Sequence, residues 1–354
     1  MMDLEGSIRP ALYLAQELVK RNYDVSMLSP FMSEKVEKHL CTSDITPFNL
    51  RSKLFTMRLG FSLVWFESWM REAFLKLNSR HVENNSSVAI NFSQVVSLPA
   101  FVWYLQGPPS FALKDIEKEL SAGFRMPYIC LKPAIEFADK RLIKRLSNVS
   151  SFIVANSKFC ASMYSKEGVD VDDVIYPPVD CEIFHPSTSN PSSDYVLTYF
   201  GKETKFSVIK AVADLDVKIR AFGSKVPFVK KNMLNHPNIE FLGRVSTKEL
   251  VDLYSNASFT FFPFTHEPFG YVPLESMACG TPVLTYDLQG PGEYVIDGKV
   301  GWLANSDGEI IQAAVDIWKN GYSPIVRKHC IEEAQKLDKK CYLEKWLKIL
   351  SNTG

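Results

Sequence analysis

The sequence predicts an α/β protein built from two doubly wound, Rossmann-like domains. Its 354 residues exceed one ordinary domain, and 46% apolar residues can supply two cores. Apolar periodicity switches repeatedly between helical and strand-like windows, as expected of parallel sheets with helices on both faces. Residues 177–193 are rich in Pro, Ser, Asn and Thr, a composition typical of a linker. We therefore predict domains over residues 1–180 and 195–336, a linker over 181–194, and a C-terminal helix over 337–354 that can pack back on the first domain.

The first half is expected to open with a helix over Arg9–Arg21, with Pro10 in its first turn, and a strand over Asp24–Ser29. A doubly wound domain normally begins with a strand, and only Met1–Glu5 are available for it. We expect that first strand to be short or missing, or the true start to lie upstream. The later elements of this half are a helical region over Leu50–Ser79, a strand over Val88–Phe92, helix-like residues over Leu98–Leu105, a loop at Gly107–Pro109, a helix over Ile135–Leu146, and strands over Phe152–Asn156 and Val174–Tyr176.

The second half shows a clearer alternation of strands and helices. Five strands are predicted, at Tyr195–Phe200, Lys218–Phe222, Ile239–Leu242, Phe259–Phe264 and Pro282–Tyr286. Three helices are predicted to follow them, at Asp307–Lys319, Pro324–Leu337 and Lys340–Leu350. Several of the strands run into a glycine, which is where the ligand-binding loops of such sheets lie.

Composition excludes several classes of function. The formal charge is zero, so no nucleic-acid partner is expected. The seven cysteines form no CxxC pair or Cys/His cluster, which disfavours disulfides and a structural metal and indicates a reduced, cytoplasmic protein. No stretch approaches the roughly 18 apolar residues that span a bilayer. The basic, aromatic segment Arg51–Arg80, which contains Trp65 and Trp69, has two interpretations: a helix lying peripherally on the cytoplasmic face of an anionic membrane, or a core helix, which we prefer.

The most informative segment is Phe259–Asp287, FTFFPFTHEPFGYVPLESMACGTPVLTYD. A buried strand leads into a loop that holds Glu267, Gly270 permits a close backbone turn, and a helix begins at about Tyr271 and carries Glu275. The unpaired N–H groups and the dipole of a helix start favour a diphosphate. One carboxylate can hold the transferred sugar and the other the ribose of a nucleotide.

This segment resembles glycosyltransferase family 4, the retaining enzymes of glycosyl transferases group 1. The resemblance rests on Glu267 and Glu275 with Pro268-Phe269-Gly270 between them and ACGTPV after them, and it extends over most of Phe152–Leu303. It implies the GT-B fold, in which two Rossmann-like domains face a central cleft. It also implies retention of anomeric configuration without a protein nucleophile.

The resemblance further implies roles for individual residues. Glu275 would bind the ribose. Glu267 would bind a hydroxyl of the donor sugar and have a catalytic role. Backbone groups of four residues would hold the sugar and diphosphate: Phe269, Gly270, Tyr271 and Val272. The loop Gly243, Arg244 and Val245 would lie beside the base. Lys202 and Lys205, after Gly201, would neutralise the diphosphate, and which of them does so stays open.

In the first half, Gly6 stands where the family has a glycine-rich loop, and Gln106 stands where it has a histidine near the sugar; both are assigned to the acceptor or sugar side. His266 is expected to shape its loop. The acidic run Asp170–Asp173 is interpreted as a solvated turn, so no metal is predicted.

The sequence thus predicts a metal-independent retaining glycosyltransferase with no cofactor beyond its substrate. It would move a hexose from a UDP- or GDP-sugar to a glycan or lipid-linked glycan acceptor. The alternative is a non-catalytic, glycosyltransferase-like subunit that binds a nucleotide-sugar or a glycan. No feature indicates an epimerase or a phosphorylase.

Overall fold

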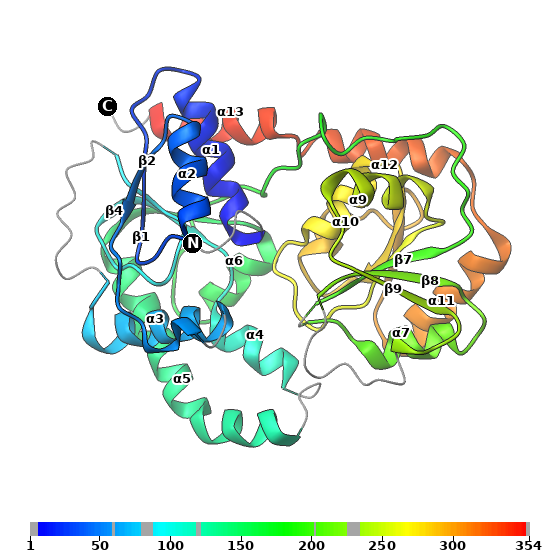
Figure 1. Cartoon of the computed structure of the whole chain (residues 1–354), viewed down its shortest axis with the longest axis horizontal. Helices are drawn as coiled ribbons and strands as arrows, with labels where there is room; N and C mark the ends of the chain where they lie inside the picture. The colour runs from blue at the N-terminus through cyan, green and yellow to red at the C-terminus, as the bar shows by residue number, and fades with distance from the viewer. Residues whose placement is uncertain are drawn as a thin grey trace. The chain divides into compact units, whose positions relative to one another are not determined.

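The computed structural model describes residues 6–58, 61–78, 88–117, 122–201, 203–224 and 234–351. The chain divides into two compact units, each described here by itself (Figure 1). Unit 1 comprises Met1–Phe111, Ile129–Pro178 and Tyr342–Gly354, and unit 2 comprises Ala112–Tyr128 and Val179–Cys341. The segment available for the first strand, Met1–Glu5, lies outside the described residues.

Unit 1 holds two parallel sheets. The smaller pairs β1 (Ser26–Ser29) with β2 (Thr46–Asn49). The larger has the order β3-β4-β5-β6, formed by Ile90–Asn91, Ala100–Leu105, Ser150–Ala155 and Asp173–Val174.

The helical prediction for Leu98–Leu105 is wrong, because β4 occupies this stretch. Val102, Trp103 and Leu105 are fully buried in a strand that has neighbours on both sides. A short apolar run of this kind does not alternate with polar residues, so periodicity alone does not distinguish it from a buried helix.

The helices of unit 1 are α1 (Arg9–Val19), α2 (Glu34–Thr42), α3 (Phe61–Leu75), α6 (Lys158–Ser165), most of α5 (Ala122–Asn148) and most of α13 (Lys339–Leu350). Helix α13 closes the core of this unit, since Trp346 is fully buried and lies 5.7 Å from Tyr104 and 5.6 Å from Phe92, measured between ring centroids. Helix α3 buries Val64, Trp69 and Ala73, as a core helix does.

Unit 2 contains one six-stranded parallel sheet, in the order β12-β11-β10-β7-β8-β9. The strands are β7 (Val196–Phe200), β8 (Ile219–Gly223), β9 (Ile239–Gly243), β10 (Thr260–Phe262), β11 (Val283–Tyr286) and β12 (Gly301–Ala304). The five predicted strands are confirmed. The sixth, β12 at the edge of the sheet, was not predicted; it pairs with β11.

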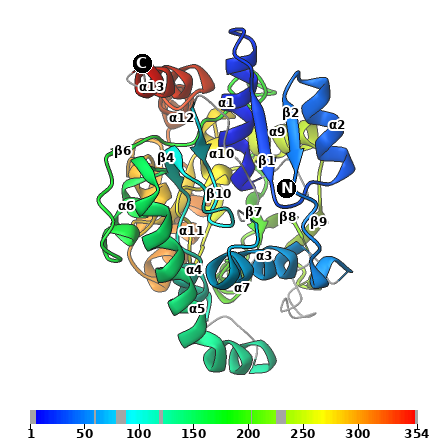
Figure 2. The ribbon, with the colours of Figure 1, turned by 90° about the vertical axis from the view of Figure 1, so that its left-hand side faces the viewer.

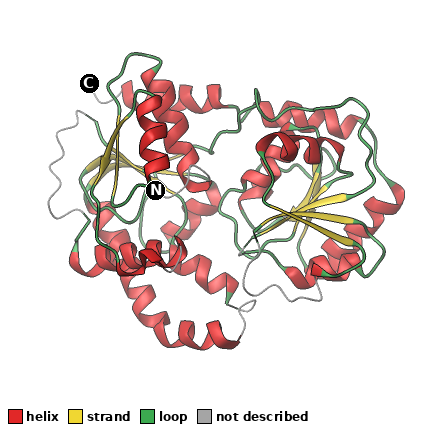
Figure 3. Ribbon diagram, in the orientation of Figure 1, coloured by secondary structure: helices red, strands yellow, loops and turns green. Residues whose placement is uncertain are grey.

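Helices cover both faces of this sheet (Figure 3). Helices α7 (Phe206–Ala213) and α11 (Asp307–Asn320) contact each other on one face, and α9 (Thr247–Asn256), α10 (Tyr271–Ala278) and α12 (Ile325–Gln335) cluster on the other. The chain builds β7, β8 and β9 outward in one direction and then crosses to the other side of β7 to build β10, β11 and β12. The sheet therefore has a topological switch point between β7 and β10, where α/β sheets bind ligands. Among the described helices, none combines the length and apolarity needed to cross a membrane.

Candidate functional site

The loops that follow β7 and β10 meet at the switch point and are joined by backbone hydrogen bonds. Lys205 N–H donates to the Pro263 carbonyl at 2.9 Å, and Thr265 N–H donates to the Glu203 carbonyl at 2.8 Å. The buried Thr204 hydroxyl oxygen accepts a bond from Gly201 N–H at 2.8 Å. These bonds fix the carboxyl end of two adjacent central strands, so side chains placed on the two loops keep a defined spacing.

Gly270 shapes the start of helix α10. Its φ is +92°, and a Cβ atom there would lie 2.8 Å from Pro291 Cγ. The Tyr294 hydroxyl donates to the Gly270 carbonyl at 2.5 Å, and this hydrogen bond stabilises the turn. Only glycine meets both requirements at low cost. The helix therefore begins immediately after a close turn, with its first N–H groups and the positive end of its dipole directed at the loop.

A second close approach supports the same loop. Gly290 N–H donates to the Glu267 carbonyl at 3.0 Å, and a Cβ atom at Gly290 would lie 2.1 Å from the Pro268 carbonyl oxygen. A side chain at position 290 would push the Glu267 loop away from the segment that follows β11. The Gly-Pro-Gly-Glu turn η3 (Gly290–Glu293) is therefore part of the site's support.

Glu267 lies on this loop with part of its side chain exposed and its carboxyl group surrounded by protein. Desolvation by burial, together with the charge of Glu203, raises its pKa to about 8, although hydrogen bonds from the Phe269 and Gly270 backbone act in the opposite direction. The group is therefore protonated at neutral pH, so it can donate a hydrogen bond to a sugar hydroxyl as well as accept one.

Glu275 lies one turn into α10 and is only 2% exposed. The Tyr254 hydroxyl, from α9, donates to its Oε2 atom at 3.2 Å. Burial of a carboxyl group is unfavourable unless the group has hydrogen-bond partners, and Tyr254 is such a partner. Glu275 thus lies one turn from the start of α10, at the predicted place in the helix.

Lys205 precedes helix α7 at the edge of the same loops. Its ammonium lies 2.8 Å from Asp307 Oδ1 and 4.4 Å from the centre of the Tyr286 ring. The Tyr286 hydroxyl donates to the same carboxylate oxygen at 2.6 Å. Asp307, the first residue of α11, thus forms an ion pair with Lys205. The other predicted phosphate-binding lysine, Lys202, lies outside the described residues.

The residues predicted to lie near the base follow β9. Gly243 ends that strand with a φ of +74°, and the Arg244 Nε atom lies 3.3 Å from Ser224 Oγ, after β8. Val245 is half-buried in the same loop. The structure thus places the predicted donor-binding residues that it describes beyond the carboxyl ends of strands of one sheet, on the loops at the ends of β7, β9 and β10 and in the first turns of α10.

His266 is buried and has a partner that the sequence did not reveal. Its Nδ1 atom lies 2.7 Å from Asp115 Oδ2, from helix α4 (Pro109–Ile116). The other supporting residues missed by sequence reasoning are Thr204, Tyr254 and Tyr294, which the sequence separates from the Glu267–Glu275 motif. The turn residues GPGEY after β11 carried a signal for Tyr294, because glycine and proline mark a chain reversal.

The two acceptor-side residues belong to unit 1. Gln106 follows β4, and its side-chain amide donates to the Phe92 carbonyl at 2.7 Å. Gly6 starts the 3₁₀ turn η1 (Gly6–Ile8) before α1, with a φ of +66°.

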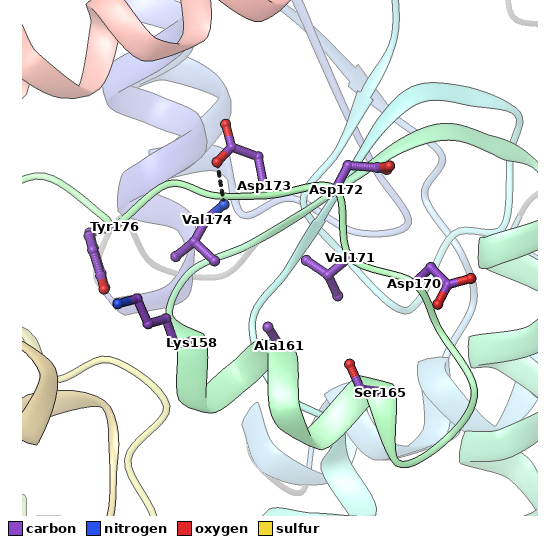
Figure 4. A pocket seen from close by; sticks show the side chains of 9 residues that line it. All are labelled: Lys158, Ala161, Ser165, Asp170, Val171, Asp172, Asp173, Val174 and Tyr176. Atoms are coloured by element: carbon purple, nitrogen blue, oxygen red, sulfur yellow. Dashed lines mark hydrogen bonds between the residues drawn. The ribbon is translucent and has the colours of Figure 1, made fainter.

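The acidic run Asp170–Asp173 borders an open hollow of about 690 Å³ in unit 1 (Figure 4). Asp172 Oδ2 accepts a bond from Ile153 N–H at 2.7 Å, so this acid pins the turn to β5. Asp173 Oδ1 accepts from Val174 N–H, also at 2.7 Å. The turn is thus anchored by its aspartates as well as solvated.

Comparisons with known proteins show which family model and which proteins this chain resembles. Residues 206–337 match the family model of glycosyl transferases group 1. The chain is 32% identical over 199 residues to an uncharacterised glycosyltransferase of Methanocaldococcus jannaschii, covering 52% of this chain and 55% of that protein. It is 28% identical over 161 residues to the D-inositol 3-phosphate glycosyltransferase of Mycolicibacterium smegmatis, covering 38% of this chain and 36% of that protein. The chain thus spans about half, or less, of the length of these curated relatives.

Two solved structures match nearly the whole chain. Anabaena HepE, in complex with UDP-glucose, has a TM-score of 0.70 at 16% identity, with 99% of this chain and 98% of that chain covered. Sucrose-phosphate synthase from Thermosynechococcus elongatus has a TM-score of 0.70 at 13% identity, with 98% and 93% covered. At these identities the likeness concerns the fold, which is the GT-B fold of two Rossmann-like domains, as predicted.

Proposed function

We propose that this protein is a metal-independent retaining glycosyltransferase of family 4 that transfers a hexose from a nucleoside-diphosphate sugar to a glycan or lipid-linked glycan acceptor. The observation that carries the proposal is the joining of the Glu203–Lys205 and Thr265–Gly270 loops at the switch point of the unit 2 sheet, directly before helix α10. The match of residues 206–337 to glycosyl transferases group 1 supports the same conclusion.

In this proposal the start of α10 and Lys205 stabilise the diphosphate as it leaves, because both place positive charge where negative charge develops. Glu275 accepts hydrogen bonds from the ribose. Glu267, protonated at neutral pH, holds a hydroxyl of the sugar. The acceptor hydroxyl oxygen attacks the anomeric carbon on the face from which the nucleoside diphosphate departs, the bond from that carbon to the diphosphate oxygen breaks, and the departing phosphate oxygen takes the hydroxyl proton. The enzyme thus contributes orientation and charge rather than a nucleophile.

Binding of the donor tests the proposal. UDP-glucose is titrated first, since Anabaena HepE holds UDP-glucose, and GDP-mannose second, both with a chelator present. We expect saturable binding of one donor to the wild type and its loss in Glu275→Ala. The variant Glu332→Gln, which removes a half-exposed carboxylate from α12, is the matched control and should bind as the wild type does.

Three outcomes decide between the functions. Binding followed by transfer, with the product's anomeric proton showing the donor's configuration in an NMR spectrum, supports a retaining enzyme. Binding with neither transfer nor hydrolysis favours the non-catalytic subunit. A folded chain that binds no nucleotide-sugar, or binds one only after metal is added, contradicts the proposal.

A further inference from the structure

Unit 1 exposes a group of large apolar side chains where two of its helices meet. They lie at the end of α3 and along α5, and they are Phe74, Leu75, Leu77, Ile129, Leu131 and Phe137. Leu75 is 61% exposed, Phe137 55% and Leu131 51%. We call these residues the α3–α5 surface. Single exposed apolar residues are ordinary, but Phe74 and Phe137 stack on each other and Leu75 adjoins Phe74 in the chain, and neighbouring exposed apolar side chains indicate an interaction site.

Helices α3 and α5 lie next to each other and are joined by hydrogen bonds (Figure 2). Arg141 and Arg145 of α5 donate to the carbonyls of Ala73 and Glu72 in the last turn of α3, at 2.9 and 2.8 Å. The rings of Phe74 and Phe137 stack with their centroids 6.1 Å apart. The apolar side chains therefore stand on packed helices, where their exposure is part of the folded structure.

The exposed face of α5 is first apolar and then basic along its length. The buried face carries Ile135, Ala138, Leu142 and Leu146, at the spacing of a helix packed against a core. The opposite face carries Ile129, Pro133 and Phe137, four residues apart, where a water-facing helix would carry polar side chains. The same face continues with the exposed Lys140 and Lys144.

The charges around the apolar residues are mostly positive. The cations are Lys76, directly after α3, and, on α5 from Ile129 onward, Lys132, Lys140, Arg141, Lys144 and Arg145. Between Ile129 and Asn148 the acids are Glu136, which is exposed, and Asp139, which is buried. Lys140 also lies 3.7 Å from Glu167, a long and solvated pairing. Exposed apolar side chains bordered by cations match the acyl chains and the charge of an anionic lipid surface.

We propose that the α3–α5 surface docks on an anionic lipid bilayer, with Phe74, Leu75 and Phe137 entering the headgroup region and Lys140 and Lys144 contacting the lipid phosphates. This inference goes beyond the proposed transfer reaction and involves none of the donor-binding residues. A second copy of the chain fits less well, because a two-fold contact through this surface would set these cations against each other. An acidic protein partner is treated as an outcome of the test.

The test measures flotation of the full chain with vesicles of phosphatidylcholine alone and with added phosphatidylglycerol. We expect binding to the anionic vesicles only, weakening as salt screens the charges. The double variant Lys140→Glu/Lys144→Glu should weaken binding by at least about 25-fold, since each cation contributes a factor of about five. Phe137→Asp should abolish it.

Matched controls lie on unit 2, where Leu215 and Lys328 are also exposed. The control variants are Leu215→Asp and the double variant Lys319→Glu/Lys328→Glu, which introduce the same kinds of charge on unit 2. Both should leave vesicle binding unchanged. Titration with the nucleotide-sugar shows that each variant is folded, and it reports the proposed function separately from membrane binding. The proposal is overturned if the wild type does not float with anionic vesicles, or if the α3–α5 variants float as the wild type does. It is also overturned if Phe137→Asp instead removes self-association, or the binding of an acidic protein.

Discussion

Glu267 should make the stability of this protein fall as the pH rises. Its folded-state pKa of about 8 lies above the ordinary value of 4.5, so between these pH values the folded chain binds a proton that the unfolded chain has released. Stability is therefore fully present below about pH 4.5 and is lost as the pH rises towards 8. The difference of about 3.5 pH units corresponds to at most about 5 kcal/mol, and solvent at the partly exposed side chain reduces this to about 2–3 kcal/mol.

The variant Glu267→Gln keeps the shape and the hydrogen bonds of the protonated acid and removes its titration. We expect it to match the wild type at about pH 5 and to be more stable by about 2–3 kcal/mol at about pH 9, as measured by calorimetric unfolding. Glu332→Gln, at an exposed position, should change neither value. If wild type and Glu267→Gln lose stability in parallel over this range, then Glu267 is not protonated in the folded protein and the account of its environment is wrong.

Three further predictions concern the parts that support the site and the core. Gly270→Ala should cost about 1–3 kcal/mol and weaken donor binding, because its φ is positive and its Cβ would meet Pro291; thermal unfolding and titration measure the two effects. Trp346→Ala should cost about 3–5 kcal/mol in urea unfolding, because the ring is fully buried, and a smaller loss would show that α13 packs loosely. Asp307→Asn should strengthen UDP-glucose binding by at most about five-fold in calorimetry, because it releases Lys205 from an exposed ion pair; unchanged affinity would separate Lys205 from the diphosphate.

The sequence predicted the second half well because its signals are local. Each of its first five strands is rich in apolar residues and ends near a turn, and the helix start at Tyr271 follows from the glycine before it. Gly270 and Glu275 could be placed relative to each other because one helical turn separates Glu275 from the helix start. The order of the strands in the sheet could not be predicted from the sequence. The crossing of the chain from β9 to β10, which creates the switch point, depends on packing between residues far apart in the chain.

The helices and strands of the first half were harder to predict, because several of them are short or buried on all sides. β4 reads as a helix-like run because Val102, Trp103 and Leu105 leave no polar residue to set a period of two. The strand β3 has only two residues, fewer than any periodicity can reveal. Long-range contacts also complete this unit, since the last helix of the chain supplies Trp346 to its core.

Lys205 shows where sequence reasoning about a site stops. Its place at the edge of the β7 loop follows from the local chain, because Thr204 closes the turn after that strand. The direction of its ammonium does not follow, because Asp307 lies 102 residues away and reaches it only through the return of the chain along β11 and β12. The ammonium of Lys205 is thus held by a carboxylate of another loop in the structure. In the proposed function the donor competes with Asp307 for this ammonium, so we expect the affinity to depend on a residue that the Glu267–Glu275 motif does not contain.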